Sequence, residues 1–216
     1  EVPTCLDTIA RLEITSLTKE DLEKTALYSQ ERQRQSQLNA LTETGGSIDD
    51  YLQSLNMKMT VGLDDMSLLP RLAQLTQKTN QFNLTTRRYS EQDIAGKIDA
   101  DKTHVYHFSL ADNFGDSGIV GLAIIEQQGD DSARLDTFLM SCRVIGRKAE
   151  QAFLHSILGD LSTKGVRTLI GEYIPTRKNT LVESFLPDND FQYTEDGAYV
   201  RTLLVAANQP AIDFPI

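Results

Sequence analysis

The order of apolar and polar residues divides the chain into a polar first part and a strand-rich remainder. Residues 1–15 fit a short helix, and residues 21–41 predict a long helix with few apolar positions, which ends at Thr44-Gly45-Gly46-Ser47. Residues 49–55 predict a further short helix, and residues 57–63 predict a strand. A helix this polar usually covers or connects other elements. We therefore expect residues 1–63 to form an N-terminal helical extension.

From Asp64 onward, strands alternate with helices. Helices are expected at residues 67–76, 90–98, 148–164 and 179–186, and strands at residues 104–110, 118–126, 134–142, 167–174 and 199–206. A run of strands followed by strand–helix units is typical of a mixed sheet with helices on its faces. We predict an α/β (α+β) domain over residues 64–216, and ligands of such sheets tend to bind beyond the carboxyl ends of the strands.

One thiol lies at a position of this kind. The strand over residues 134–142 ends at Cys142, and a glycine and a helix follow it. Backbone amides at a helix start carry partial positive charge, bind anions and lower the pKa of nearby thiols. Cys142 is therefore a candidate nucleophile, with Arg143 and Arg147 as cationic neighbours. The alternative is a buried core cysteine that only packs, and this stretch alone favours that alternative.

Composition limits the classes of partner. The 216 residues carry a net charge of −10, which disfavours nucleic acids and anionic membranes and leaves small molecules and proteins. Two cysteines, Cys5 and Cys142, make no disulfide framework, so we expect reduced thiols and a cytoplasmic location. The histidines and cysteines have no zinc-site spacing, so we expect no metal. No long apolar run or signal segment is present, and the first residue, Glu1, fits a chain cut from a longer protein.

The segment Arg143-Val144-Ile145-Gly146-Arg147-Lys148 resembles the acyl-coenzyme A loop of the Gcn5-related N-acetyltransferase (GNAT) fold, Arg/Gln-x-x-Gly-x-Gly/Ala. In that loop, backbone amides approach a pyrophosphate or pantetheine group. Gly146 matches the pattern, whereas Lys148 replaces the last glycine, which is expected to crowd the loop and weaken binding of free coenzyme A. The resemblance implies a GNAT-like, largely antiparallel central sheet flanked by helices.

Longer runs resemble the C-terminal half of FkbH-like proteins. They are Gln74–Tyr89, Phe114–Gly118, Leu139–Val144 and Gly171–Asn179. That family joins a phosphatase half to an acetyltransferase-like half. The resemblance implies that a glyceryl group from 1,3-bisphosphoglycerate is loaded onto an acyl carrier protein for polyketide biosynthesis, through a thioester on Cys142. It implies no tightly bound cofactor, and the phosphopantetheine arm of the carrier as acceptor. The phosphatase motif Asp-x-Asp-x-Thr is missing, so residues 1–63 would be a linker from an absent phosphatase half.

Other candidate residues each have a structural alternative. Asp116 is a candidate catalytic base or orienting carboxylate, or else an ordinary turn aspartate. Three polar residues of one loop are candidate substrate contacts, or else members of a self-bonded loop: Thr79, Asn80 and Asn83. Three residues that follow a strand are candidate phosphate or pantetheine contacts: Thr176, Lys178 and Asn179. The alternative is that Asn179 is an ordinary helix N-cap.

Arg87 and Arg88 are candidate phosphate ligands, although adjacent residues on a strand face opposite ways. His107 could serve as a base facing Cys142, but a single histidine in a strand is more often structural. For the whole chain, two other functions stay open. One is a non-catalytic module that docks a carrier protein, and the other is a coenzyme A-dependent N-acetyltransferase, which would leave the nucleophilic cysteine unexplained.

Overall fold

The computed structural model describes residues 19–203. The expected helix over residues 1–15, Cys5 and the tail beyond residue 203 lie outside these residues. By internal contacts, the chain divides into a unit that ends at Tyr51 and a unit that begins at Leu52. The first unit contains α1 (Lys19–Glu43), and α2 (Ile48–Ser54) spans the division. Gly45 has a φ of 80° in the turn between these helices, which is the break that the sequence predicts.

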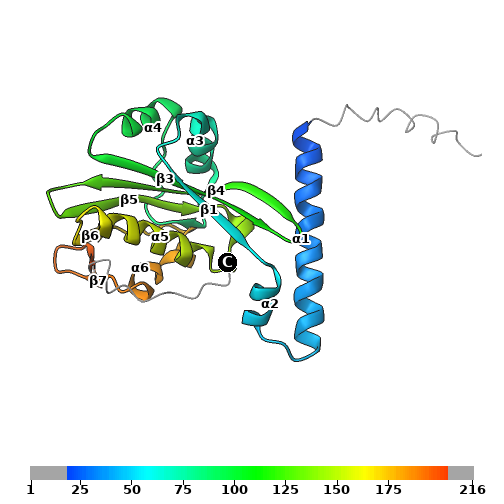
Figure 1. Ribbon diagram of the computed structural model, residues 1–216. Coiled ribbons are helices and arrows are strands. Elements are labelled where there is room, and N and C mark those ends of the chain that lie inside the picture. The colour runs from blue at the N-terminus through cyan, green and yellow to red at the C-terminus, as the bar shows by residue number, and fades with distance from the viewer. Residues whose placement is uncertain (1–18, 204–216) are drawn as a thin grey trace, which may run out of the picture. The chain divides into compact units, whose positions relative to one another are not determined.

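The second unit is built on a mixed sheet (Figure 1). Its strand order is β1-β3-β4-β5-β6-β8-β7, and β2 (Phe82–Asn83) pairs with β5 off this path. The bounds are β1 (Lys58–Leu63), β3 (Thr103–Asp112), β4 (Gly115–Gln127), β5 (Ser132–Met140), β6 (Thr168–Gly171), β7 (Gln192–Tyr193) and β8 (Tyr199–Thr202). Only β5 and β6 pair in parallel among the described strands. The predicted fold class, a largely antiparallel mixed sheet flanked by helices, is confirmed.

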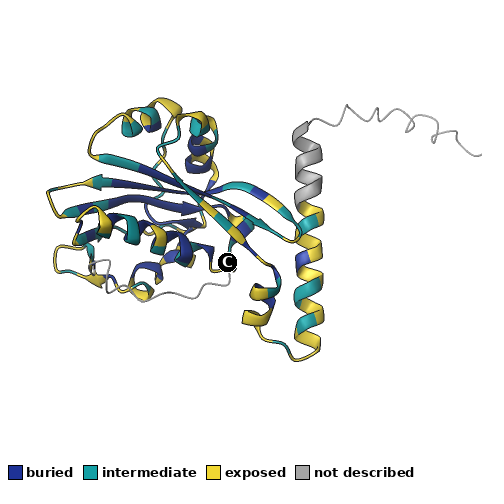
Figure 2. Ribbon diagram, viewed as in Figure 1, coloured by how far each residue is buried: buried dark blue, intermediate teal, exposed yellow. Residues whose placement is uncertain are grey.

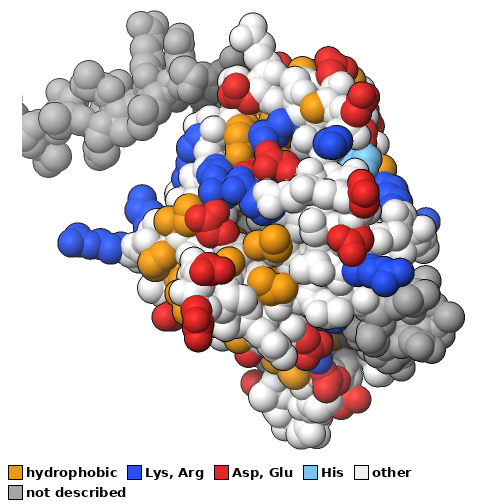
Figure 3. Space-filling view, turned by 90° about the vertical axis from the view of Figure 1, so that its left-hand side faces the viewer, with side chains coloured by type: hydrophobic (Ala, Val, Ile, Leu, Met, Phe, Trp, Pro, Cys, Tyr) orange, Lys and Arg blue, Asp and Glu red, His pale blue; other side chains and the backbone are white. Residues whose placement is uncertain are grey.

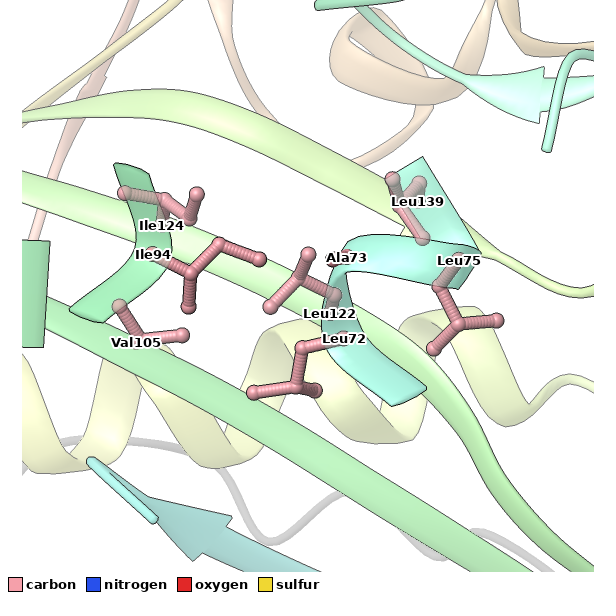
Figure 4. Packing of buried hydrophobic residues seen from close by; sticks show 8 residues of the cluster. All are labelled: Leu72, Ala73, Leu75, Ile94, Val105, Leu122, Ile124 and Leu139. Carbon is pink, nitrogen blue, oxygen red and sulfur yellow. The ribbon is translucent and has the colours of Figure 1, made fainter. Parts of the chain in front are cut away.

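Two helices cover one face of the sheet, α3 (Leu69–Lys78) and α4 (Glu91–Ile98). The apolar positions of these helices meet those of β3, β4 and β5, and strand residues are the most deeply buried part (Figure 2). Figure 4 shows this cluster, in which Leu72, Leu122 and Ile124 have no exposed surface. Ser90 and Asp93 form a reciprocal capping box that starts α4, as the sequence predicts for Ser90.

The other face packs against α5 (Ala149–Thr163) through aromatic rings. The Phe153 ring lies 4.6 Å from that of Phe108 and 5.4 Å from that of Phe138. The ring of Phe138 also stacks at 5.0 Å on Phe185 of α6 (Phe185–Asp188). Gly121 on β4 has no side chain because a Cβ there would overlap the Phe108 ring. The core therefore holds β5 rigidly from both faces.

The end of one element differs from the sequence prediction at a place that matters for function. β5 ends at Met140, whereas the sequence predicts a strand through Cys142. β1 pairs with β3 from Lys58↔Ala111 to Leu63↔Tyr106, so the predicted boundary between residues 63 and 64 follows a strand of the sheet.

On the face in Figure 3, basic and acidic side chains adjoin one another. Among the described residues, Lys97 pairs with Glu126 at 2.8 Å.

Candidate functional site

Cys142 lies directly beyond the carboxyl end of the central strand β5. Met140 pairs with Gly121 of β4, and the Ser141 N–H donates to the Val120 carbonyl at 2.7 Å, which extends the ladder by one residue. Cys142 then begins a short 3-10 turn over Cys142–Val144. It is a free cysteine with an exposed side chain. The alternative of a buried, inert core thiol is therefore wrong.

The electrostatic setting of this thiol differs from the sequence prediction. We expected Cys142 to lie at a helix start, but α5 begins at Ala149, and residues 143–148 lie between them. The helix start that the sequence predicts directly after the thiol is therefore not found there. The cation next to Cys142 is Arg143, which is half-buried and whose Nε lies 3.4 Å from the Ser141 Oγ.

The backbone conformation of the loop over residues 143–148 accounts for the two glycine positions in the acyl-coenzyme A loop pattern. Gly146 has a φ of 83° and Lys148 a φ of 57°, so both pattern glycines correspond to left-handed backbone conformations. Lys148 adopts this conformation despite its Cβ. Arg147 fixes the loop to the end of β3, because its Nη1 lies 3.1 Å from Asp112 Oδ2, and its Nη2 donates to the Arg143 carbonyl at 2.9 Å. The exposed side-chain fractions of this pair are only 7% and 1%.

Asp116 is exposed at the hairpin that joins β3 and β4. Its Oδ1 accepts a hydrogen bond from the Gly118 N–H at 2.7 Å, and Gly118 has a φ of 65°. These are the features of an aspartate that stabilises a turn. Within residues 19–203, no hydrogen bond joins Asp116 to Cys142. Its catalytic role stays a prediction.

The amide-rich run of residues 79–89, which we call the arm, lies beside the second half of β5. β2 within the arm pairs with Leu139 and Met140, and the Leu84 N–H donates to the Phe138 carbonyl at 3.1 Å. β6 pairs with β5 only as far as Leu135↔Gly171. Past that point the arm separates β5 from the chain that follows β6, because the Ile174 N–H donates to the Leu84 carbonyl at 2.9 Å. The arm thus fills the opening between the two parallel strands.

Two buried asparagines hold the arm in place, and neither has exposed surface. Asn83 Nδ2 donates to the Thr79 carbonyl at 3.1 Å, and its Oδ1 accepts from the Thr86 N–H at 2.8 Å. Asn179 Nδ2 donates to the carbonyls of Asn83 (2.9 Å) and Ile174 (3.0 Å). Its Oδ1 accepts from the Thr176 N–H and Oγ1. The Asn179 side chain thus uses both of its N–H donors and accepts two hydrogen bonds, and Asn83 makes one bond from each end of its amide.

Asn179 is the N-cap residue of a short 3-10 turn over Thr180–Val182, as the alternative predicts, but its side chain makes no capping hydrogen bond there. The Arg88 guanidinium binds the carbonyls of Thr76 and Thr79 and the side chain of Asn80, so the amides of the arm are largely bonded within it. Lys178 is exposed, and its backbone N–H donates to Thr176 Oγ1 at 3.3 Å. Substrate contacts of these residues stay predictions.

Asp136, on the buried part of β5, is the centre of a charged network. Tyr89 donates its hydroxyl proton to Asp136 Oδ2 at 2.6 Å, and Arg134 binds Oδ1 at 2.8 Å. Arg87 donates to the Asp136 carbonyl at 2.7 Å and pairs with Glu172 at 2.6 Å. Burial acts to raise the pKa of Asp136, but hydrogen bonds from Tyr89 and Thr137 and nearby cations outweigh it and lower that pKa. The guanidinium of Arg87, a candidate phosphate ligand in the sequence analysis, is therefore already paired with the carboxylates of Asp136 and Glu172.

His107 on β3 is buried, and its Nδ1 has no hydrogen-bond partner in the described part of the protein. A Cβ at Gly62 would overlap its ring, which shows how closely β1 approaches. Burial lowers the pKa of His107, although the charges of Asp65 and Asp64 oppose this effect. The described contacts give His107 a structural setting, and its role as a base stays a prediction.

Two groups were missed by sequence reasoning. Asp136 carried a detectable signal, because it is a lone acid within the apolar run Leu135-Asp136-Thr137-Phe138, where a buried charge requires partners. Arg71 on α3 carried none, since an arginine on a surface helix is ordinary. Its guanidinium reaches the β4 strand, where Nε donates to the Ile119 carbonyl at 3.0 Å.

Two kinds of site are absent from residues 19–203. No group of three or more histidine, cysteine, aspartate or glutamate side chains there is placed to hold a metal ion. None of the helices in that range is both long and apolar enough to cross a membrane.

Comparison with protein-family models and with curated proteins finds no match. Solved structures do match. The ribosomal-protein-S18-alanine N-acetyltransferase of Escherichia coli has a TM-score of 0.51 and 19% identity, over 73% of this chain and 100% of that one. A GNAT-family acetyltransferase from Desulfovibrio desulfuricans has a TM-score of 0.52 and 13% identity, over 68% and 100% of the two chains.

The PaiA N-acetyltransferase of Thermoplasma acidophilum, solved in complex with coenzyme A, has a TM-score of 0.50 and 13% identity, over 66% of this chain and 96% of that one. At such identities the likeness concerns the fold alone. The chain therefore has the fold of the Gcn5-related N-acetyltransferases.

Proposed function

We propose that this protein is an acyltransferase that works through a thioester on Cys142. It takes a glyceryl or similar small hydroxyacyl group from 1,3-bisphosphoglycerate and loads it onto the phosphopantetheine arm of an acyl carrier protein, in polyketide biosynthesis in the cytoplasm. The observation that carries this proposal is the free, exposed thiol of Cys142, which follows the central strand and adjoins Arg143. The resemblance to FkbH-like proteins supplies the acyl group and the partner.

The proposed chemistry consists of two displacements. The Cys142 thiolate attacks C1 of the acyl phosphate, the bond from C1 to the phosphate oxygen breaks, and inorganic phosphate leaves. The sulfur then carries a 3-phosphoglyceryl group, and hydrolysis of the remaining phosphate is the work of the separate phosphatase half. In the second displacement the pantetheine thiolate attacks the thioester carbonyl, and Cys142 leaves as a thiolate.

The arm favours a carrier-bound acceptor over free coenzyme A. In an open α/β sheet, ligands bind in the crevice beyond the carboxyl ends of the strands. Here β2 and the Asn83–Asn179 bond occupy the opening between β5 and the chain after β6. Cys142 lies outside that filled opening and is exposed, so a pantetheine arm presented by a protein can reach it from solvent.

Intact-protein mass spectrometry tests this function. The purified chain is mixed with 1,3-bisphosphoglycerate generated in situ, and the expected result is one 3-phosphoglyceryl adduct that hydroxylamine removes. Cys142→Ala abolishes the adduct, whereas Cys142→Ser retains any binding without forming a thioester. Addition of a phosphopantetheinylated carrier protein transfers the adduct. Failure of the wild-type chain to form an adduct would refute the thioester mechanism.

The fold gives the N-acetyltransferase alternative its support, because the matched structures include an enzyme in complex with coenzyme A. Calorimetric titration with acetyl-coenzyme A separates the two proposals. We expect no binding, since the opening is filled. Tight binding together with acetylation of an amine in the Cys142→Ala variant would favour the alternative. Carrier binding without an adduct would instead indicate a docking module.

A further inference from the structure

Arg71 and Arg143 come from distant parts of the chain, and each contacts a residue at or next to the Ser141–Val120 hydrogen bond that precedes Cys142. The Arg71 guanidinium donates to the Ile119 carbonyl from Nε (3.0 Å) and from Nη2 (2.7 Å). The next residue, Val120, accepts a hydrogen bond from the Ser141 N–H at 2.7 Å. Arg143 Nε lies 3.4 Å from Ser141 Oγ. Arg71 is thus bonded to β4 one residue before the strand position that pairs with Ser141, and Arg143 contacts the side chain of Ser141 itself, the residue before Cys142.

The two positive charges repel one another. Burial of Arg71 lowers its pKa, and the charge of Arg143 lowers it further. Neither guanidinium forms an ion pair with a carboxylate in the described residues. Arginines elsewhere in this unit with comparable or deeper burial each have an acidic partner: Arg87 with Asp136 and Glu172, Arg134 with Asp136, Arg147 with Asp112 and Arg201 with Asp190.

This absence of an acid is notable because acids are in excess. The chain has 31 aspartates and glutamates against 21 lysines and arginines. Two half-buried like charges without a counterion destabilise a fold. An anion between them would offset that repulsion. Each arginine has five N–H donors, and the contacts of Arg71 with Ile119 and Gln74 leave some of its donors free.

We propose that Arg71 and Arg143 bind a phosphate group beside Cys142. This inference rests on the proposed function and names its substrate contact. Guanidinium forks match phosphate oxygens in charge and geometry. Two sources have this chemistry, the phosphorylated acyl donor and the phosphopantetheine arm of the carrier. With the donor, the pair would hold the C3 phosphate while the Cys142 thiolate attacks the C1 carbonyl.

Protection of Cys142 against alkylation tests the site without requiring acyl transfer. Iodoacetamide reacts with the exposed thiol, and inorganic phosphate is titrated at constant ionic strength kept with sodium chloride. The expected result is a saturable slowing of alkylation in the wild type. Arg71→Gln and Arg143→Gln each raise the apparent Kd for phosphate by about tenfold or more, and Arg71→Lys recovers part of the affinity. Arg167→Gln, at an exposed arginine on the β6 side, leaves the Kd unchanged.

The source of the phosphate follows from two further titrations, with 3-phosphoglycerate and with 4′-phosphopantetheine. Protection by the first assigns the pair to the acyl donor, and protection by the second assigns it to the carrier arm. Equal phosphate affinity in the wild type and both glutamine variants, or no protection at any concentration, would overturn the site. A further measurement separates this site from the proposed thioester chemistry: the thermal stability of Cys142→Ala is measured with and without phosphate. Phosphate stabilises this variant if the arginine site is correct, even if the thioester chemistry is wrong.

Discussion

Asn179 donates a side-chain hydrogen bond to the main-chain carbonyl of Asn83 at 2.9 Å, across 96 positions of the sequence. The bond joins the arm to the segment after β6, at the place where β5 and β6 cease to pair. A long-range contact of this kind closes the sheet on the side of the candidate site.

Asn179→Ala is expected to destabilise the protein by about 2–4 kcal/mol, because it leaves the buried Asn83 carbonyl, the part-buried Ile174 carbonyl and the Thr176 N–H without this partner. Denaturant unfolding measures this loss, and amide exchange at Leu84 and Ile174 should rise with it. Asn189→Ala is the matched control, since Asn189 Nδ2 makes one bond, to the Phe185 carbonyl, at 2.7 Å. Its expected cost is about 1 kcal/mol. Equal costs for both variants would contradict the closing role of Asn179.

Tyr89→Phe removes the hydroxyl that donates to Asp136. The expected loss at pH 7 is about 1.5–3 kcal/mol, because the acceptor is a buried carboxylate. The pKa of Asp136 is lowered in the folded state, so its stabilising effect is present above its ordinary pKa near 3.8 and is lost as pH falls through the folded value. The difference in unfolding free energy between Tyr89→Phe and the wild type should therefore become smaller at acidic pH. Tyr193→Phe, at a side chain that is 67% exposed, should show no such pH dependence.

His107 should make the protein less stable as pH falls below about 6.5. Burial lowers its folded-state pKa, so the unfolded chain binds a proton at a higher pH than the folded chain does. Unfolding free energies measured between pH 8 and pH 5 should decline, and His107→Gln should flatten part of that decline. His155 contributes in the same direction, because burial lowers its pKa too. If the unfolding free energy of His107→Gln declined between pH 8 and pH 5 with the same slope as that of the wild type, His107 would not be the source of the decline.

Lys148→Gly should stabilise the protein by about 0.5–1 kcal/mol. A left-handed residue with a Cβ costs about 1–2 kcal/mol, and the extra freedom of glycine in the unfolded chain offsets part of the gain. Thermal unfolding measures the change. Lys148→Ala is the control, since it removes the charge and keeps the Cβ, and we expect no gain from it. If Lys148→Ala stabilised the protein by the same amount, the gain would come from removal of the lysine charge and not from relief of the left-handed backbone conformation.

Sequence patterns predicted most of the fold because its signals are local. The polar helix α1, the capped start of α4 at Ser90 and the apolar strands around β5 all follow from periodicity and caps. The end of β5 was placed two residues too late, since no glycine or proline interrupts the sequence at Ser141 and Cys142 although the backbone turns there. The pairing of β2 with β5 had no signal, because a two-residue strand shows no periodicity.

For the candidate site, the sequence identified residue types rather than contacts. Cys142 and Arg143 were found from a strand end and a loop pattern. Arg147 was expected at the thiol, but its buried partner Asp112 is 35 positions away, and no local pattern pairs them. Arg71 reaches the site from α3 only because helix packing brings it over β4.

The Asn83–Asn179 bond also constrains how the molecule assembles. A fragment that ends before Asn179 lacks the partner of the Asn83 carbonyl and of Ile174, and it leaves the arm fastened on one side only. During synthesis on the ribosome, β5 and the arm emerge long before the residue that secures them. Native closure of this region is therefore a late, non-local event, and chains truncated before Asn179 should be captured by chaperones or proteases rather than accumulate.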